Sequence, residues 1–119
     1  LALARERLAP GGTVVIFVPA MPSLYGTMDA VSGHFRRYRR EELRSVLRRS
    51  GLTVDDIRNF DAVGVVPYWL SYRVLGRAKL DAASVGLYDK VVIPLSLAFS
   101  RLTGRRGPGK NLIAVGSRA

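Results

Sequence analysis

The apolar run from Thr13 to Val18 constrains the fold more than any other part of this sequence. It consists of β-branched and aromatic side chains without polar alternation, which is typical of a strand covered on both faces in an α/β sheet. Leu1 to Leu8 resembles the last turns of a helix, which Pro10 ends. Gly11-Gly12 supply the positive φ angles of a tight turn. The N-terminal part of the chain is therefore predicted to be a helix, a turn and a buried strand.

The segment from Arg40 to Arg49 is predicted to be an amphipathic surface helix, because its apolar residues recur at helical spacing and arginines occupy the opposite face. Gly51 follows as the residue that ends this helix in a left-handed conformation. The next stretch, Leu52 to Phe60, alternates apolar and charged residues imperfectly. That pattern predicts a half-exposed strand with a β-bulge.

Two apolar segments, Val63 to Leu75 and Ser84 to Leu102, follow this strand and are predicted to be helices. Pro94 is expected to kink or divide the second one, because proline removes a helical hydrogen bond. The uncharged runs in this region are shorter than a bilayer requires and contain prolines, so a soluble or peripheral protein is expected. The stretch from Gly104 to Gly109 is predicted to be a loop before the last strand, Asn111 to Val115.

The segment between Pro19 and Tyr38 carries the candidate chemistry. It follows the carboxyl end of the first strand, where open α/β sheets bind ligands, and its length is typical of a lid or binding loop. Its last part reads Gly-His-Phe-Arg-Arg-Tyr, so the chain's only histidine, His34, stands beside an arginine cluster. Histidine ordinarily titrates near neutral pH. His34 is therefore the natural general base or, alternatively, a hydrogen-bonding anchor of the loop.

Three stretches together resemble the C-terminal half of a class I S-adenosylmethionine-dependent methyltransferase of the type 11-like subfamily: the Pro-Gly-Gly turn with its strand, the His and Arg-Arg-Tyr loop, and the closing Lys-Asn-Leu-Ile-Ala-Val-Gly. The resemblance covers nearly the whole chain. It implies an α/β fold, namely the C-terminal part of a Rossmann-like methyltransferase sheet with flanking helices. Residues 1–119 would form the acceptor-side portion of one domain, whose N-terminal cofactor-binding half would be absent from this chain.

In that sheet, Thr13 to Val18, Leu52 to Phe60 and Asn111 to Ser117 would be the fifth, sixth and seventh strands. The resemblance places the last of them antiparallel between the other two. The family usually has a serine or threonine after the Arg-Arg-Tyr sequence to cap the next helix. Here that position is Arg39, which has no acceptor for the free amide protons of a helix start.

The methyltransferase reading gives roles to five residues of the loop. His34 would remove a proton from a hydroxyl or amine acceptor that Tyr25 or Tyr38 orients. Arg36 and Arg37 carry forked donors suited to a carboxylate or phosphate, and one of them is alternatively a clamp that ties the loop to the sheet. Neighbouring side chains of an extended segment point in opposite directions, so only one arginine is expected to reach a substrate.

Pro19 and Ala20 would form part of the pocket wall near the methyl donor, by resemblance alone. The aromatic residues Tyr68, Trp69 and Tyr72 either roof a lipid-like or aromatic acceptor or, as is commoner, belong to a core or to an interface with the missing N-terminal half. The donor, S-adenosylmethionine, requires a glycine-rich turn after the first strand of the sheet and an acidic ribose contact. Neither is in this sequence, so only the full-length enzyme is expected to bind the cofactor.

The formal net charge of +10 favours anionic partners. Aromatic residues are not interleaved with the basic ones in a stacking pattern, which argues against nucleic acid. The absence of cysteine excludes disulfides and thiolate metal sites, and no metal site is predicted. The expected partner is a small-molecule or glycan- or lipid-linked acceptor of a cytoplasmic enzyme. The alternative is a non-catalytic basic module that binds phosphate-bearing partners or an anionic membrane surface.

Overall fold

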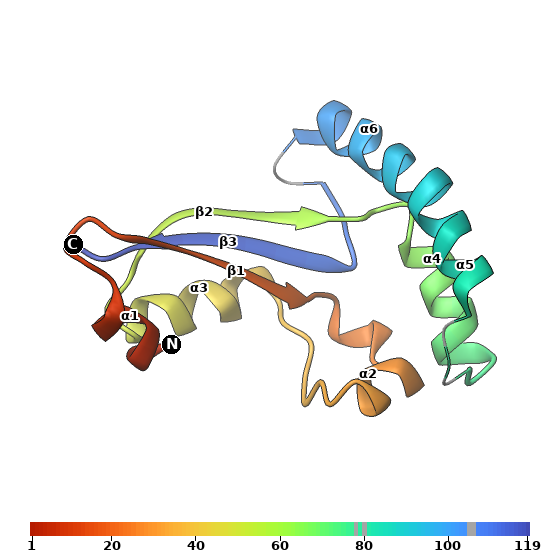
Figure 1. The fold of residues 1–119 in the computed structure, drawn as a ribbon, viewed down its shortest axis with the longest axis horizontal. Helices are drawn as coiled ribbons and strands as arrows, with labels where there is room; N and C mark the ends of the chain where they lie inside the picture. The colour runs from red at the N-terminus through yellow and green to blue at the C-terminus, as the bar shows by residue number, and fades with distance from the viewer. Residues whose placement is uncertain (78, 80, 105–106) are drawn as a thin grey trace.

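The computed structural model describes residues 1–77, 79, 81–104 and 107–119. It is mixed α/β, with a small three-stranded antiparallel sheet and flanking helices (Figure 1). The strands are β1 (Thr13–Pro19), β2 (Thr53–Phe60) and β3 (Asn111–Ser117). Their order is β1-β3-β2, and β3 is antiparallel to both neighbours. β1 and β2 therefore run in the same direction, and their carboxyl ends lie at the same end of the sheet.

The pairing register places the side chains of paired residues on the same face of the sheet. Val15 of β1 pairs with Val115 of β3. In β2 the register shifts between Val54 and Asp56, so the predicted bulge is confirmed. The shift leaves Asp55 outside the ladder, where its carboxylate accepts a hydrogen bond from the Ser117 hydroxyl at 3.0 Å.

The hydrophobic core lies on one face of the sheet, which packs against the amphipathic helix α3 (Arg40–Arg49). This helix and α1 (Ala2–Arg7) are both confirmed where the sequence predicted them. Leu43 and Leu47 of α3 are buried against the sheet, which stabilises the fold by roughly 1.5–3 kcal/mol for each side chain. The remaining buried members of this core are Ala20, Leu52, Ile57, Leu112 and Ala114.

The prediction that β1 is covered on both faces is wrong for this chain. Val15 and Phe17 are 67% and 60% exposed, whereas Val14, Ile16 and Val18 pack against the core. The reason is that α3 and the core cluster occupy only one face of the sheet, and β1 is an edge strand. The apolar run therefore forms a half-buried strand with a bare apolar face.

Much of the predicted loop between β1 and α3 is helical. It contains a short 3-10 turn, η1 (Pro22–Leu24), and the helix α2 (Thr27–Val31). At the start of α3, the Glu42 carboxylate accepts a hydrogen bond from the Arg39 amide at 2.8 Å, and this bond holds the pKa of Glu42 below its ordinary value. The helix is therefore capped from inside its first turn, although Arg39 itself supplies no side-chain acceptor.

Two consecutive helical arms follow β2 and form a hairpin beyond the carboxyl ends of β1 and β2 (Figure 1). The first arm is α4 (Val65–Tyr68) and the π-helical η2 (Trp69–Val74). The second arm is α5 (Ala82–Leu87), the π-helical η3 (Tyr88–Val92) and α6 (Ile93–Thr103). We call these two arms the helical hairpin.

The second arm is one continuous helix of 22 residues, so Pro94 does not divide it, and a kink at Pro94, the other predicted outcome, stays a prediction. Proline lacks the amide proton that an α-helix needs at that position. The hydrogen-bonding pattern changes to π-helical just before Pro94, which accommodates the missing donor within a continuous helix.

The turns that join these elements agree with the sequence at Gly11 and Gly51, whose φ angles are 74° and 75°. Gly12 has no positive φ, and a side chain there would collide with the carbonyl of Ala9 instead. The predicted loop from Gly104 to Gly109 is described only in part, because residues 105–106 lie outside the described residues.

Candidate functional site

The segment after β1 folds back onto the end of the sheet, and Arg37 holds it there. The Tyr38 amide donates to the carbonyl of Pro19 at 2.9 Å, and Tyr38 forms a β-bridge with Ala20. The Arg37 side chain is only 3% exposed, and its Nη1 donates to the carbonyls of Ala20 at 2.8 Å and Lys110 at 3.2 Å. Arg37 is therefore a clamp between this segment, the end of β1 and the start of β3.

Asp29 in α2 is fully buried and is the common partner of several polar groups at this end of the sheet. Its Oδ2 accepts hydrogen bonds from Arg37 Nε at 2.9 Å, the Gly26 amide at 3.0 Å and the Tyr68 hydroxyl at 3.1 Å. Burial alone would raise the pKa of Asp29, but the bonds from Arg37 and Gly26 hold that pKa below its ordinary value. The buried carboxylate is therefore ionised at neutral pH.

His34 lies at the exposed end of this network. Its Nδ1 is 3.4 Å from Asp29 Oδ1, and its amide donates to the Asp29 carbonyl at 2.8 Å. The Tyr25 hydroxyl donates to the His34 carbonyl at 3.1 Å, so the backbone is held from both sides. A carboxylate that accepts from Nδ1 fixes the tautomer in which Nε2 accepts a proton, which is the arrangement a histidine base requires. The half-exposed ring is accessible to an acceptor.

Arg36 and Tyr38 lie on the outer side of the segment. The Arg36 guanidinium stacks on the Tyr38 ring, 4.7 Å from its centroid, and forms an ion pair with Glu42 at 3.3 Å. The Arg36 side chain is 56% exposed, whereas the Arg37 side chain is enclosed. Of the two predicted arginine donors, Arg36 is therefore the one that an anionic ligand could contact from solvent.

A second buried carboxylate, Asp61, comes directly after β2 and has a φ of 64°. It accepts hydrogen bonds from the Gly64 amide at 2.9 Å, the Ser96 hydroxyl at 2.6 Å and the Tyr88 hydroxyl. Lys110 Nζ lies 3.3 Å from its Oδ2. Burial lowers the pKa of Lys110, and burial together with the bond to Asp61 raises the pKa of Tyr88. Asp61 thus joins the second arm of the hairpin to the sheet.

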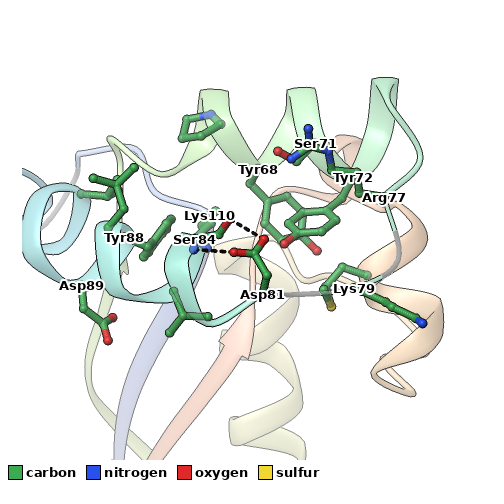
Figure 2. A pocket seen from close by; sticks show the side chains of 15 residues that line it. Tyr68, Ser71, Tyr72, Arg77, Lys79, Asp81, Ser84, Tyr88, Asp89 and Lys110 are labelled. Carbon is green, nitrogen blue, oxygen red and sulfur yellow. Dashed lines mark hydrogen bonds between the residues drawn. The ribbon is translucent and has the colours of Figure 1, made fainter.

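A pocket of about 490 Å³ opens between α2 and the two arms of the hairpin (Figure 2). Tyr68 and Tyr72 from the first arm face it, as does Tyr88 from the second. Lys110 Nζ lies 4.9 Å from the ring centroid of Tyr68 and 4.6 Å from that of Tyr88, so a cation and aromatic rings share the pocket wall. Burial raises the pKa of Tyr68 to about 12, so its hydroxyl stays protonated and continues to donate to Asp29.

None of the five predicted residues of the loop lines this pocket. Tyr68 and Tyr72, two of the three aromatic residues that the sequence offered as a roof over an apolar acceptor, do line it. Tyr25 and His34 lie at the Asp29 network. Arg36 pairs with Glu42 on the outer side of the segment, whereas Arg37 and Tyr38 hold the segment to the sheet. Of the predicted donor-side residues, Ala20 is buried and Pro19 is half-buried. Their contact with a methyl donor stays a prediction. The connection between the predicted residues and the pocket is Tyr68, which bonds to Asp29 and faces the pocket.

Sequence reasoning missed the two buried carboxylates and Lys110. One signal was present for Asp29, because it is the only acidic residue between Glu6 and Glu41 in a strongly basic chain. An isolated carboxylate among arginines indicates a paired charge. The position of Asp61 at the end of a predicted strand was a weaker signal of a buried charge. Its ion pair with Lys110 has no signal in the sequence.

Comparisons of the chain with family models, with curated proteins and with solved structures found no match. In the part of the chain that the structure describes, no group of three or more His, Asp or Glu side chains is arranged to hold a metal ion. The candidate site is therefore defined by the geometry of Asp29, His34, Tyr68 and Lys110 and by the pocket beside them.

Proposed function

We propose that this chain is the acceptor-side portion of a class I S-adenosylmethionine-dependent methyltransferase, with β1, β2 and β3 as the fifth, sixth and seventh strands of its Rossmann-like sheet. The observation that carries the proposal is the strand order β1-β3-β2 with β3 antiparallel in the middle. The resemblance in the sequence implies this order, and simple neighbour-to-neighbour pairing along the chain would give a different one. We further propose a cytoplasmic location.

The position of the site supports the same function. Ligands of open α/β sheets bind outside the carboxyl ends of parallel strands. The Asp29 network lies at the carboxyl end of β1, and Asp61 lies at that of β2. The pocket between α2 and the hairpin is in the same region, and its aromatic walls suit an acceptor with an apolar part.

His34 would act on the proton of the acceptor. A hydroxyl or amine that gains a methyl group must lose a proton, and Nε2 of His34 is the site that accepts it. The Asp29 carboxylate beside Nδ1 stabilises the imidazolium that forms. Arg36 is accessible for binding a carboxylate or phosphate of the acceptor, while Tyr25 and Arg37 hold the backbone on which His34 stands.

The residues present do not fit the methyl donor. The glycine-rich stretch from Gly104 to Gly109 follows helix α6 in the chain, and its last residue, Gly109, packs against the backbone of Phe60 so closely that no side chain fits there. It is a tight contact with β2 and offers no cradle for a nucleoside. We therefore propose that S-adenosylmethionine is bound by an N-terminal half of the enzyme that this chain does not contain.

Calorimetric titration with S-adenosylmethionine tests whether the cofactor is bound outside this chain. The chain of residues 1–119 is expected to show negligible heat of binding, and the same chain extended by its upstream coding sequence is expected to bind. Micromolar affinity of the chain alone would contradict the proposal, as would an upstream sequence without a strand and glycine-rich turn. The competing hypothesis of a basic binding module predicts further basic sequence in that place and no binding in either form.

A further inference from the structure

The helical hairpin exposes many apolar side chains. Along the second arm, Val91, Leu95 and Leu102 recur at helical spacing outside the pocket, and each is between 45% and 87% exposed. The first arm adds a second group of exposed apolar residues, Val66, Trp69, Leu70 and Val74, and Leu75 follows directly after it. An apolar surface of this extent on a water-soluble protein marks a contact with a partner or a membrane.

The second arm meets the length and hydropathy of a membrane span. It has 22 residues and contains an 18-residue window with a mean hydropathy of 1.4, of which only 6% is buried. This finding differs from the expectation that the apolar runs of the region are too short. The arm nevertheless contains Asp89 and Lys90, and its Tyr88 and Ser96 donate hydrogen bonds to the buried Asp61. Spanning would break these bonds and place charges in hydrocarbon, so the geometry favours a helix that lies on a bilayer.

The charge of the hairpin agrees with an anionic surface. Between residues 65 and 103, five basic residues stand against the two acidic residues Asp81 and Asp89. The basic residues are Arg73, Arg77, Lys79, Lys90 and Arg101, and all are exposed. Trp69 adds an amphipathic ring of the type that prefers the membrane interface. A second copy of the chain is a poorer occupant, because apposed hairpins would bring these same cations together.

We propose that the helical hairpin docks the protein onto an anionic lipid bilayer, with its apolar stripe in the interface and its basic residues at the headgroups. The pocket opens between the two arms, so an acceptor with a lipid tail reaches it while the tail stays in the bilayer. The lipid-linked acceptor rests on the proposed function. The docking itself does not, because it requires no methyl donor.

The chain carries its own probe, since Trp69 is its only tryptophan and is half-exposed on the docking surface. The experiment mixes the full chain with phosphatidylcholine vesicles, with or without phosphatidylglycerol. We expect a blue shift of Trp69 emission on the anionic vesicles that weakens as salt is added. Lipids brominated near the headgroup should quench Trp69 more than lipids brominated at the chain end. An unshifted spectrum on anionic vesicles, or stronger quenching at the chain end, would overturn interfacial docking.

Matched variants identify the surface. Replacing Leu95 and Leu102 by serine should lower vesicle binding by roughly tenfold for each leucine. Leu3→Ser is the control, because the exposure of Leu3 lies between those of the two leucines and it is on α1 at the other end of the sheet (Figure 1), so it should leave binding unchanged. Lys90→Ala and Arg101→Ala should each cost roughly fivefold on anionic vesicles only. Circular dichroism establishes that each variant is folded.

The outcomes separate the competing occupants. Equal loss from Leu3→Ser would show that the effect is not specific to the hairpin and would overturn the proposal. Self-association without vesicles that the Leu95 and Leu102 changes abolish would assign the surface to a second copy instead. If the extended enzyme transfers a labelled methyl group only to water-soluble products, the lipid-linked acceptor is wrong and the methyltransferase stands. Vesicle binding by an extended chain that transfers no methyl group would support the docking and contradict the proposed function.

Discussion

Replacement of Arg37 by leucine should destabilise the fold strongly, because Arg37 is the buried partner of the Asp29 carboxylate. The guanidinium donates to Asp29 at 2.9 Å and to two main-chain carbonyls, and it lies 4.6 Å from the ring centroid of Tyr68. Removing one partner of a buried pair leaves an uncompensated charge, which costs roughly 3–5 kcal/mol of the free energy of unfolding. Urea denaturation followed by Trp69 fluorescence, at low salt, measures the change.

The adjacent arginine is the matched control. Arg36 has the same side chain but is exposed, and its pair with Glu42 is open to solvent, so Arg36→Leu should change the stability by less than about 1 kcal/mol. Combining Arg37→Leu with Asp29→Leu should restore part of the lost stability, since no buried charge then lacks a partner. Equal effects of the two single arginine variants, or no recovery in the double variant, would refute the clamp.

Three further predictions concern the site and the bare sheet. In the full-length enzyme, His34→Ala should lower turnover by roughly 10² to 10⁴ without changing the cofactor Kd, and turnover within a factor of two of the wild type would make His34 a structural residue. Because the pKa of Asp29 is depressed on folding from 3.8, its ionised form stabilises the protein above that pH and the contribution is lost as the pH falls through the folded pKa. The urea midpoint of the wild type should therefore drop more steeply below about pH 4 than that of Asp29→Asn, and parallel curves would contradict this assignment. The exposed β1 edge with Val15 and Phe17 should form oligomers that grow with ionic strength in light scattering, as salt screens the +10 charge, whereas a monodisperse monomer at high salt would show that the chain is self-sufficient.

The periodicity of apolar residues was sufficient to predict the elements that have one buried face and one exposed face. The apolar positions of α3 recur at helical spacing because Leu43 and Leu47 contact the sheet, so the helix could be placed from residues 40–49 alone. The bulge in β2 was predictable for the same reason, since its alternation breaks where the register shifts. The strand order, in contrast, came only from the resemblance to a methyltransferase, because pairing between distant strands leaves no local pattern.

The sequence predicted which segment carries the candidate site, but it did not predict the hydrogen bonds that connect the residues of the site. The loop with His34 and the two arginines was found from its unusual composition. Its central partner, Asp29, belongs to a short helix that periodicity cannot detect, and its bond to Tyr68 joins residues far apart in the sequence. Pro94 failed as a helix breaker because the adjoining π-helical turn removes the need for its missing amide. The contacts of Asp29 and the π-helical turn before Pro94 depend on the three-dimensional packing, which has no local pattern in the sequence.

Transfer of a labelled methyl group tests the central claim most directly. The chain extended by its upstream coding sequence is incubated with methyl-labelled S-adenosylmethionine and an extract of the source cells. We predict that label enters an acceptor, and that His34→Ala reduces the rate at least about a hundredfold while Phe35→Ala, which changes a fully exposed neighbour, leaves it intact. Absence of label from every fraction, with an extended chain that is folded, would contradict the methyltransferase assignment.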